Sequence, residues 1–197
     1  MMTDAELIRK SLDGELAAFN TIVWRWQPAI YRFALRFLGD SEDARDVTQK
    51  IFIKVYKSLR SLHDPERFSA WIYRIAVNMC KDERKRHRKH EFLPIENIDK
   101  NASRAHAPSA PDRNSPAERM HREDLQRLLN DALARLPEAQ RTVIIMKEFQ
   151  ELKFREIAEI LGISENTVKS RMYYGLDALR KIFASWDIDK EVIHYEL

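Results

Sequence analysis

The sequence has little cysteine and glycine and no long uncharged segment. Its 197 residues include one cysteine, Cys80, and four glycines. A single cysteine excludes an intramolecular disulfide framework and any zinc or iron–sulfur site built from several cysteines. The longest uncharged run, residues 16–24, is far too short to span a bilayer. The first residues also lack the basic and then apolar order of a signal peptide. We therefore expect a cytoplasmic protein with no direct membrane insertion.

Neither sign of charge is in clear excess, since 34 Lys and Arg face 31 Asp and Glu. A net charge of +3 does not by itself indicate nucleic acid, so the position of the charges matters more. With 44% apolar residues, the chain can bury a core. The scarcity of glycine and apolar spacings of three and four favour helices, and no stretch alternates with period two. We predict an all-α fold without a sheet.

The N-terminal part reads as three main helices. A stripe covers residues 15–38, and Pro28 within it predicts a kink or two abutting helices. Gly39 ends this segment, and Ser41 is predicted to cap the next helix. That helix directs the following residues inward: Val47, Ile51, Val55, Leu59 and Leu62. A third helix over 67–90 has as its buried side Phe68, Ile72, Ile75, Ala76 and Met79.

Composition predicts two small helical domains joined by a flexible linker. Residues 1–92 form the first domain, and 93–115 form the linker, where proline, Asn, Ser, Ala and Asp gather. The second domain covers 116–185. It begins with Ser115 as N-cap and Pro116 at the first helical position, runs as one helix to about Arg135, and continues as three short helices. Residues 186–197 form an acidic tail.

A helix-turn-helix is predicted at about 153–173. Gly162 supplies a left-handed turn, Ser164 caps the second helix, and Ala158 is small where that helix must pass close by. The core side of the second helix is predicted to hold Val168, Met172, Leu176 and Leu179. The opposite face and its flanks carry groups suited to base edges and phosphates, at Asn166, Thr167, Lys169, Ser170, Arg171, Tyr173, Tyr174 and Asp177. An ordinary helical hairpin with a solvated face is the alternative.

The helix over 67–90 has a second face in which aromatic residues alternate with cations. The predicted members are Trp71 at the boundary, Tyr73, Arg74, Val77, Asn78 and Lys81. A dense basic run, residues 84–90, follows. Rings that stack on bases and cations that follow phosphates are typical of single-stranded nucleic-acid binding. Core aromatics beside a solvated helix end are the alternative. The helix before it has a polar face that fits solvent or a protein partner, with Asp43, Asp46, Gln49, Lys50, Lys54 and Lys57.

In this order and at this spacing, four segments resemble the extracytoplasmic-function (ECF) class of sigma-70-type RNA polymerase sigma factors. They are residues 43–56, 68–78, 136–141 and 156–171. The resemblance implies that 1–92 is sigma region 2, which binds core polymerase and melts and reads the −10 element. It implies that 116–185 is sigma region 4, which reads the −35 element as duplex. Lys50 stands where an acidic residue is usual, and Tyr174 and Gly175 replace a basic residue and Ala.

The resemblance also implies contacts and partners. Contacts with the clamp helices of the largest polymerase subunit fall on Asp43, Asp46, Gln49, Lys50 and Phe52. Contacts with the −10 strand fall on His63, Phe68, Trp71, Tyr73, Arg74, Asn78 and Lys81. Contacts with the −35 duplex fall on Asn166, Thr167, Lys169, Ser170, Arg171, Tyr173 and Tyr174. The expected partners are core RNA polymerase through its clamp helices and flap, promoter DNA and an anti-sigma factor, which could hold the chain at a membrane.

Three other classes of function compete. An enzyme would need a reactive pair such as Cys80 with His87 or His90, or His63 with Asp64. No third orienting group and no glycine-rich phosphate loop accompany these pairs, so we expect no catalytic residue, metal site, cofactor or small-molecule substrate. An autonomous helix-turn-helix regulator would bind duplex DNA without polymerase, as a dimer. A helical adaptor would not explain the helix-turn-helix or the aromatic and basic face of the helix over 67–90.

Overall fold

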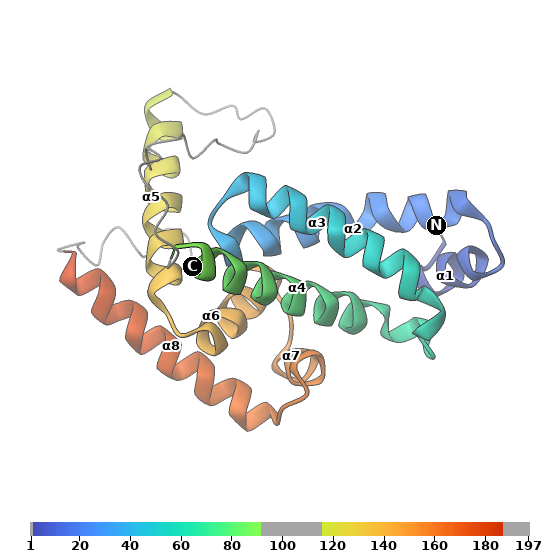
Figure 1. Ribbon diagram of the computed structural model, residues 1–197. Helices are drawn as coiled ribbons and strands as arrows, with labels where there is room; N and C mark the ends of the chain where they lie inside the picture. Colours follow the sequence, from blue (N-terminus) through green and yellow to red (C-terminus); the bar gives the residue numbers. More distant parts are fainter. Residues whose placement is uncertain (1, 92–115, 187–197) are drawn as a thin grey trace. The chain divides into compact units, whose positions relative to one another are not determined.

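A computed structural model describes residues 2–91 and 116–186, which are helical and contain no strand (Figure 1). This confirms the all-α prediction. The helices are α1 (Asp4–Leu12), α2 (Leu16–Leu38), α3 (Ser41–Ser58), α4 (Phe68–Glu91), α5 (Pro116–Arg135), α6 (Glu138–Ile144), α7 (Phe154–Leu161) and α8 (Glu165–Ser185). Two short 3-10 helices, η1 (Leu59–Ser61) and η2 (Pro65–Arg67), and a π-helical turn, η3 (Ile145–Phe149), complete them.

The chain divides into two compact units: one contains α1–α4 together with Glu159–Gly162 at the end of α7, and the other contains α5, α6, the start of α7 and α8. The linker predicted at 93–115 and the tail predicted from 187 onward lie outside the described residues. Trp186, which we assigned to the tail, is instead the C-cap of α8. Among the helices of the described ranges, none combines the length and the apolar character that crossing a bilayer requires.

The first unit buries its core among α2, α3 and α4, which pack against one another, while α1 packs on α2. Phe33, Ile51 and Ile72, one from each of the three central helices, are fully buried. All five inward residues predicted for the α3 segment are buried, although Leu59 and Leu62 lie beyond the end of α3. The spacing of apolar residues therefore predicted the α3 part of this core correctly, whereas on α4 two residues predicted for the buried side, Ile75 and Met79, are only half-buried.

Helix α1 has no counterpart in the sequence prediction, although its start carries a clear signal. The Thr3 side chain accepts a hydrogen bond from the backbone N–H of Glu6, and the Glu6 carboxylate accepts one from the N–H of Thr3. This reciprocal pair is a capping box, and it satisfies two amides that helix formation leaves open. Asp4 then fastens α1 to α2, because its carboxylate pairs with Arg25 and accepts a hydrogen bond of 2.9 Å from Trp26 Nε1.

Helix α2 runs without interruption through Pro28, so the expectation of two abutting helices is wrong. Proline lacks the N–H that would bond to the carbonyl of Trp24. Both Pro28 and Trp24 are exposed. Water can therefore satisfy the released carbonyl, and the helix loses one hydrogen bond instead of breaking.

The turn between α2 and α3 confirms one prediction and corrects another. Gly39 ends α2 with φ of +83°, a left-handed conformation that glycine adopts without steric cost. The N-cap of α3 is Asp40 and not Ser41, because the Asp40 carboxylate accepts hydrogen bonds from the amides of Glu42 and Asp43 at 2.8 and 2.9 Å. Ser41 is the first helical residue and is buried.

In the second unit, α5 extends from Pro116 to Arg135, as predicted. Its C-terminal end is held by Arg141 of α6, whose side chain is almost fully buried. The guanidinium donates hydrogen bonds to the carbonyls of Leu133, Ala134 and Leu136 at 2.6, 2.8 and 2.8 Å. These carbonyls are among those that a helix end leaves without partners. Arg141 therefore fixes the junction between α5 and α6.

The helix-turn-helix forms as predicted over α7 and α8. Gly162 has φ of +65°, the N–H of Ile163 bonds to the carbonyl of Ala158 at 3.1 Å, and the Ser164 hydroxyl accepts a hydrogen bond from the amide of Thr167. Helix α8 is long rather than short, with 21 residues.

One position of the predicted core side of α8 is wrong. Leu176 is 41% exposed, and Gly175 is buried in its place, next to Ile144 of α6. A Cβ at position 175 would lie 2.7 Å from Ile144 Cδ1. Gly175 therefore allows α6 and α8 to approach closely, which gives the family departure at this position a packing role.

Candidate nucleic-acid interface

The exposed face of α8 brings together most of the residues predicted for duplex contact. Asn166, Lys169 and Ser170 are exposed near the start of the helix, one turn beyond the Ser164 cap. Tyr173 and Tyr174 follow with 69% and 61% of their surface exposed and their rings edge to face at 5.6 Å. Aromatic side chains this exposed do not stabilise the core. Exposed apolar groups that gather on one face are typical of a surface that contacts another molecule.

The two cations of this face differ in their exposure. Lys169 is exposed, pairs with Glu165 one turn earlier at 2.8 Å, and lies 5.9 Å from the Phe154 ring of α7. Arg171 and Thr167 are half-buried on the two flanks of the face. An exposed ion pair within one helix is weak, so Lys169 can exchange Glu165 for a phosphate at little cost.

The second candidate surface lies on α4 and is smaller than predicted. Phe68 is 1% and Tyr73 4% exposed, and Val77 is also buried. The Tyr73 ring packs edge to face on Trp26 and Phe33 of α2, and burial raises the pKa of Tyr73 to about 12. Phe68 and Tyr73 are therefore core residues, and the prediction that they contact a DNA strand is contradicted by their burial.

What α4 does present is a narrower row. Arg74 and Asn78 are exposed, and Trp71 and Lys81 are half-buried. Their spacing of three, four and three residues places the four side chains on one face of the helix. His63, in the loop before η2, is also exposed. Two cations, an amide, an indole edge and an imidazole thus reach the surface of this unit. The basic run continues this helix, but its side chains are described only as far as His87.

The residues predicted to contact polymerase lie in three different places. Gln49 and Phe52 line a groove of about 590 Å³ between α2 and α3. The other members of its wall are Phe19, Val23, Gln27, Tyr31, Arg45, Thr48, Ile53 and Tyr56. Asp46 is exposed on α3 outside this lining.

Asp43 and Lys50 point toward α4 instead of the groove. Lys50 pairs with Glu83 at 3.6 Å, and Asp43 lies 3.3 Å from His87. The acid-to-lysine departure at position 50 thus gives the buried Glu83 carboxylate an internal partner.

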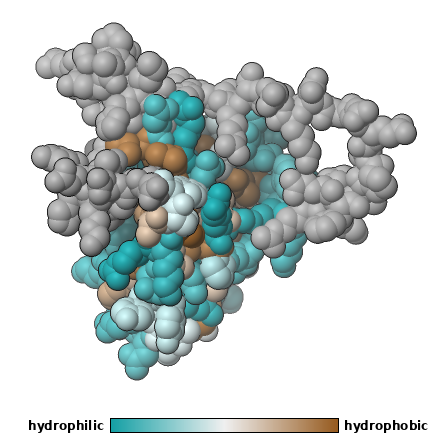
Figure 2. All heavy atoms as spheres, turned by 90° about the vertical axis from the view of Figure 1, so that its left-hand side faces the viewer, coloured by the Kyte–Doolittle hydropathy of each residue, from teal (hydrophilic) through white to brown (hydrophobic). Residues whose placement is uncertain are grey.

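The sequence analysis did not identify the groove, because it missed residues on both its α2 and its α3 side. Val23 was read only as part of a core stripe, and Ile53 and Tyr56 of α3 were not singled out at all. Both α3 side chains are about half exposed, at 48% and 53%. Their signal was present, since an isoleucine and a tyrosine stand on a face that is otherwise charged. Figure 2 shows that hydrophilic residues cover most of the described surface in that view and that hydrophobic residues reach it in small areas. Exposed apolar groups gathered at a groove are typical of a binding surface.

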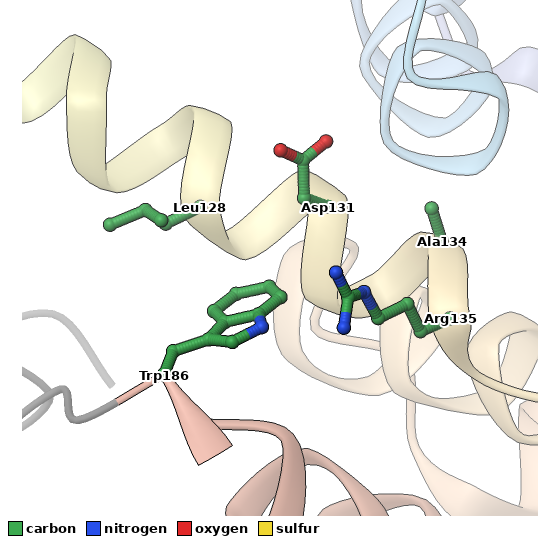
Figure 3. A pocket seen from close by; sticks show the side chains of 5 residues that line it. All are labelled: Leu128, Asp131, Ala134, Arg135 and Trp186. Carbon is green, nitrogen blue, oxygen red and sulfur yellow. The ribbon is translucent and has the colours of Figure 1, made fainter. Parts of the chain in front are cut away.

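A separate pocket of about 540 Å³ lies between α5 and the end of α8 (Figure 3). Its lining consists of Leu128, Asp131, Ala134, Arg135 and Trp186. The Arg135 guanidinium lies 4.8 Å from the centre of the Trp186 ring, within range of a cation–π interaction. This contact anchors the C-cap residue of α8 against α5 and lies away from the predicted duplex-binding residues at the start of α8.

Comparisons with known proteins agree on one family. Residues 22–90 match the family model for Sigma-70 region 2, and residues 126–179 match the model for Sigma-70, region 4. The chain is similar to the ECF RNA polymerase sigma factor SigW of Bacillus subtilis, with 32% identity over 88% of this chain and 93% of the relative. It is also similar to the RNA polymerase sigma-H factor of Pseudomonas aeruginosa, with 30% identity over 90% and 92% of the two chains.

Two solved structures have the same fold. CnrH, in complex with the cytosolic domain of CnrY, aligns with a TM-score of 0.68 at 24% identity, over 92% of this chain and 97% of CnrH. The sigma factor RpoE, in complex with the anti-sigma factor NepR from Bartonella quintana, aligns with a TM-score of 0.62 at 24% identity, over 84% and 96%.

Proposed function

The chain belongs to the ECF family of sigma-70-type RNA polymerase sigma factors, and from this premise we propose how its two helical units divide promoter recognition. It is an alternative sigma factor that binds RNA polymerase. Because the likeness to SigW extends over 88% of the chain and includes both regions, an autonomous helix-turn-helix regulator is not favoured. Transcription initiation factors of this kind leave the chemistry to polymerase, so we expect no catalytic residue in this chain.

We assign the −35 element to the second unit, residues 116–185. The observation that carries this assignment is the exposed face of α8, where two uncovered tyrosines stand with Lys169 and Ser170 beyond a capped helix start. In a helix-turn-helix, the N-terminal half of the second helix enters the major groove. Amide, hydroxyl and ammonium groups placed there can bond to base edges and phosphates.

We assign the −10 element to α4 of the first unit, residues 1–92, through Trp71, Arg74, Asn78 and Lys81 with His63. The four α4 side chains share one face, and the indole offers a surface on which an unpaired base can stack. Phe68 and Tyr73 then act indirectly, because their packing against α2 keeps α4 rigid beneath the face. A rigid support matters since strand opening costs several kcal/mol that base capture must offset.

We assign polymerase docking to the groove between α2 and α3. Its apolar wall with Gln27, Gln49 and Arg45 at the edges suits the side of a helix from a partner protein. The clamp helices of the largest polymerase subunit are the partner that the family implies. An anti-sigma factor is the second partner that we propose, by analogy with the complex of RpoE and NepR. A cytoplasmic location follows from polymerase binding.

The test is run-off transcription from genomic fragments with purified core polymerase and the full chain, followed by mapping of start sites. Once a dependent promoter is known, Lys169→Ala and Arg171→Ala are expected to weaken holoenzyme binding to duplex carrying the −35 element. A base contact should cost about 5- to 150-fold, equivalent to roughly 1–3 kcal/mol. Lys181→Ala is the matched control, since this exposed lysine lies three turns further along α8. Equal loss in all three variants would refute the −35 assignment.

Docking is tested separately by the affinity of the chain for core polymerase. Ile53→Asp places a charge in the groove wall and is expected to reduce that affinity at least tenfold. Leu16→Asp changes another exposed apolar residue, which lies at the start of α2 outside the groove, and serves as the control. Permanganate reactivity of promoter thymines then tests the −10 assignment, because Asn78→Ala should preserve polymerase binding but reduce strand opening.

A further inference from the structure

Three potential metal ligands gather where the first turn of α3 meets α4. They are Asp43 of α3 and Glu83 and His87 of α4, and one ligand atom from each lies within 4.8 Å of the other two. Glu83 and His87 are four residues apart and share one face of the helix. The Glu83 side chain is only 8% exposed, whereas those of Asp43 and His87 are 31% and 49% exposed. The buried Glu83 thus has a fixed position in the cluster, while Asp43 and His87 leave the cluster accessible to solvent.

The distances fit metal ligation better than hydrogen bonding. His87 Nε2 lies 3.3 Å from Glu83 Oε1 and 3.3 Å from Asp43 Oδ1. Charge-assisted hydrogen bonds between such groups are shorter, about 2.7–2.9 Å, and one N–H cannot point at both oxygens. Two ligands at about 2.0–2.1 Å from a tetrahedral zinc ion stand about 3.3–3.4 Å apart. The imidazole nitrogen already holds this separation from both carboxylates.

We infer that Asp43, Glu83 and His87 form a binding site for a divalent transition-metal ion of the Zn²⁺ type. One imidazole and two carboxylates suit Zn²⁺, and also Co²⁺ or Ni²⁺, better than Mg²⁺ or Ca²⁺, which take oxygen ligands. Three protein ligands leave one tetrahedral position to a water molecule. This site goes beyond the promoter-recognition function, which needs no metal, and it departs from our expectation from the sequence.

Two cations already occupy the neighbourhood and must yield to the metal. Lys50 pairs with Glu83 at 3.6 Å, and Arg86 pairs with the same carboxylate. Their side chains are 43% and 57% exposed, so both can swing into solvent, while Glu83 cannot. Exchange of two single positive charges for one double charge leaves the charge facing the two carboxylates unchanged.

Occupation of the site would join the start of α3 to α4. Asp43 is the third residue of α3, the helix that carries one wall of the proposed polymerase groove, and α4 carries the proposed −10 face. A ligand that binds only the folded chain stabilises it in proportion to the logarithm of its concentration over Kd. The metal would therefore raise the melting temperature of the first unit.

The test is titration of the full chain, freed of metal by EDTA, with Zn²⁺ in a calorimeter and with Co²⁺ in a spectrophotometer. We expect one ion per chain and Co²⁺ absorption bands typical of a low-coordinate site with nitrogen and oxygen ligands. His87→Ala and Asp43→Asn should each weaken binding at least tenfold. His63→Ala, which removes another exposed histidine of the same unit, should leave the affinity unchanged. Absence of binding below about 100 μM Zn²⁺, or equal affinity in His87→Ala, would overturn the inference.

The variant Arg86→Gln distinguishes a metal site from a network of ion pairs. It changes an exposed residue, so it should not prevent folding. If Arg86 competes with the metal for Glu83, its removal should tighten Zn²⁺ binding several-fold and enlarge the melting-temperature rise on addition of Zn²⁺. If the cluster serves only as an ion-pair network, the variant should lose stability and gain no affinity for Zn²⁺, and this result would also overturn the inference.

Discussion

The contact between Gly175 of α8 and Ile144 of α6 supports a quantitative prediction. Replacement of a helical glycine by alanine normally stabilises a helix by about 1 kcal/mol. Here the new Cβ would lie 2.7 Å from Ile144 Cδ1 and 3.2 Å from Gln140 Cβ. Overpacking of this kind costs about 1–3 kcal/mol. We therefore expect Gly175→Ala to lower the free energy of unfolding of the second unit by about 0–2 kcal/mol.

A double-mutant cycle isolates the steric part of this effect. Ile144→Val removes the Cδ1 atom that the new methyl group would meet, and alone it should cost about 0.5–1.5 kcal/mol. In the double variant the alanine methyl fills part of the space that the shorter valine side chain leaves, so the two losses should not add. We expect the double variant to be at least about 1 kcal/mol more stable than the sum of the single effects predicts.

Native-state hydrogen exchange of the full chain provides the measurement. Amides of α6 and α8 that exchange through opening of the second unit give its unfolding free energy directly. Additivity of the two substitutions within about 0.5 kcal/mol would refute the proposed contact. Stabilisation by the full amount expected for a helical glycine, about 1 kcal/mol, in Gly175→Ala alone would refute it as well, because that result would mean that no neighbour has to move.

Three further substitutions or reagents probe other parts of the fold. Arg141→Met should cost the second unit about 3–5 kcal/mol in urea denaturation, because it leaves buried carbonyls without their charged donor; Arg127→Met, at an exposed ion pair of α5, should cost below about 1 kcal/mol. Glu151→Gly should raise the melting temperature of that unit, since Glu151 has φ of +54° and a left-handed non-glycine residue costs about 1–2 kcal/mol; a lower melting temperature would show that the Glu151 side chain stabilises the turn. Burial of Cys80 raises the pKa of its thiol, so the folded chain should react with a thiol reagent such as DTNB only after unfolding; rapid reaction at about pH 8 without denaturant would contradict this placement.

The sequence predicted the turns well because its signals there are steric. Gly39 was expected to end its helix and Gly162 to supply a left-handed turn, and both residues have positive φ at these turns. Pro116 was expected to begin a helix, and it does. The cap was displaced by one residue, from Ser41 to Asp40, because both side chains can accept a backbone N–H and only the local geometry decides between them.

Burial on the helices was predicted less well because it depends on what packs against each face. Helix α4 packs on both α2 and α3, so its buried face is wide enough to include Tyr73 and Val77. A single stripe of apolar residues does not show this second neighbour. At Gly175 the difficulty was of another kind, since a residue without a side chain gives no hydrophobic signal, and the neighbouring Leu176 was taken in its place.

The passage of α2 through Pro28 sets a condition on any protein that covers this part of the helix. Because Pro28 has no N–H, it cannot donate the usual hydrogen bond to the carbonyl oxygen of Trp24, and both residues are exposed to solvent. A binding partner that covered this oxygen with an apolar side chain would leave it buried without a hydrogen bond, at a cost of about 1–3 kcal/mol. A partner that covers the exposed Trp24 ring should therefore place a hydroxyl, an amide or a cation near this carbonyl oxygen.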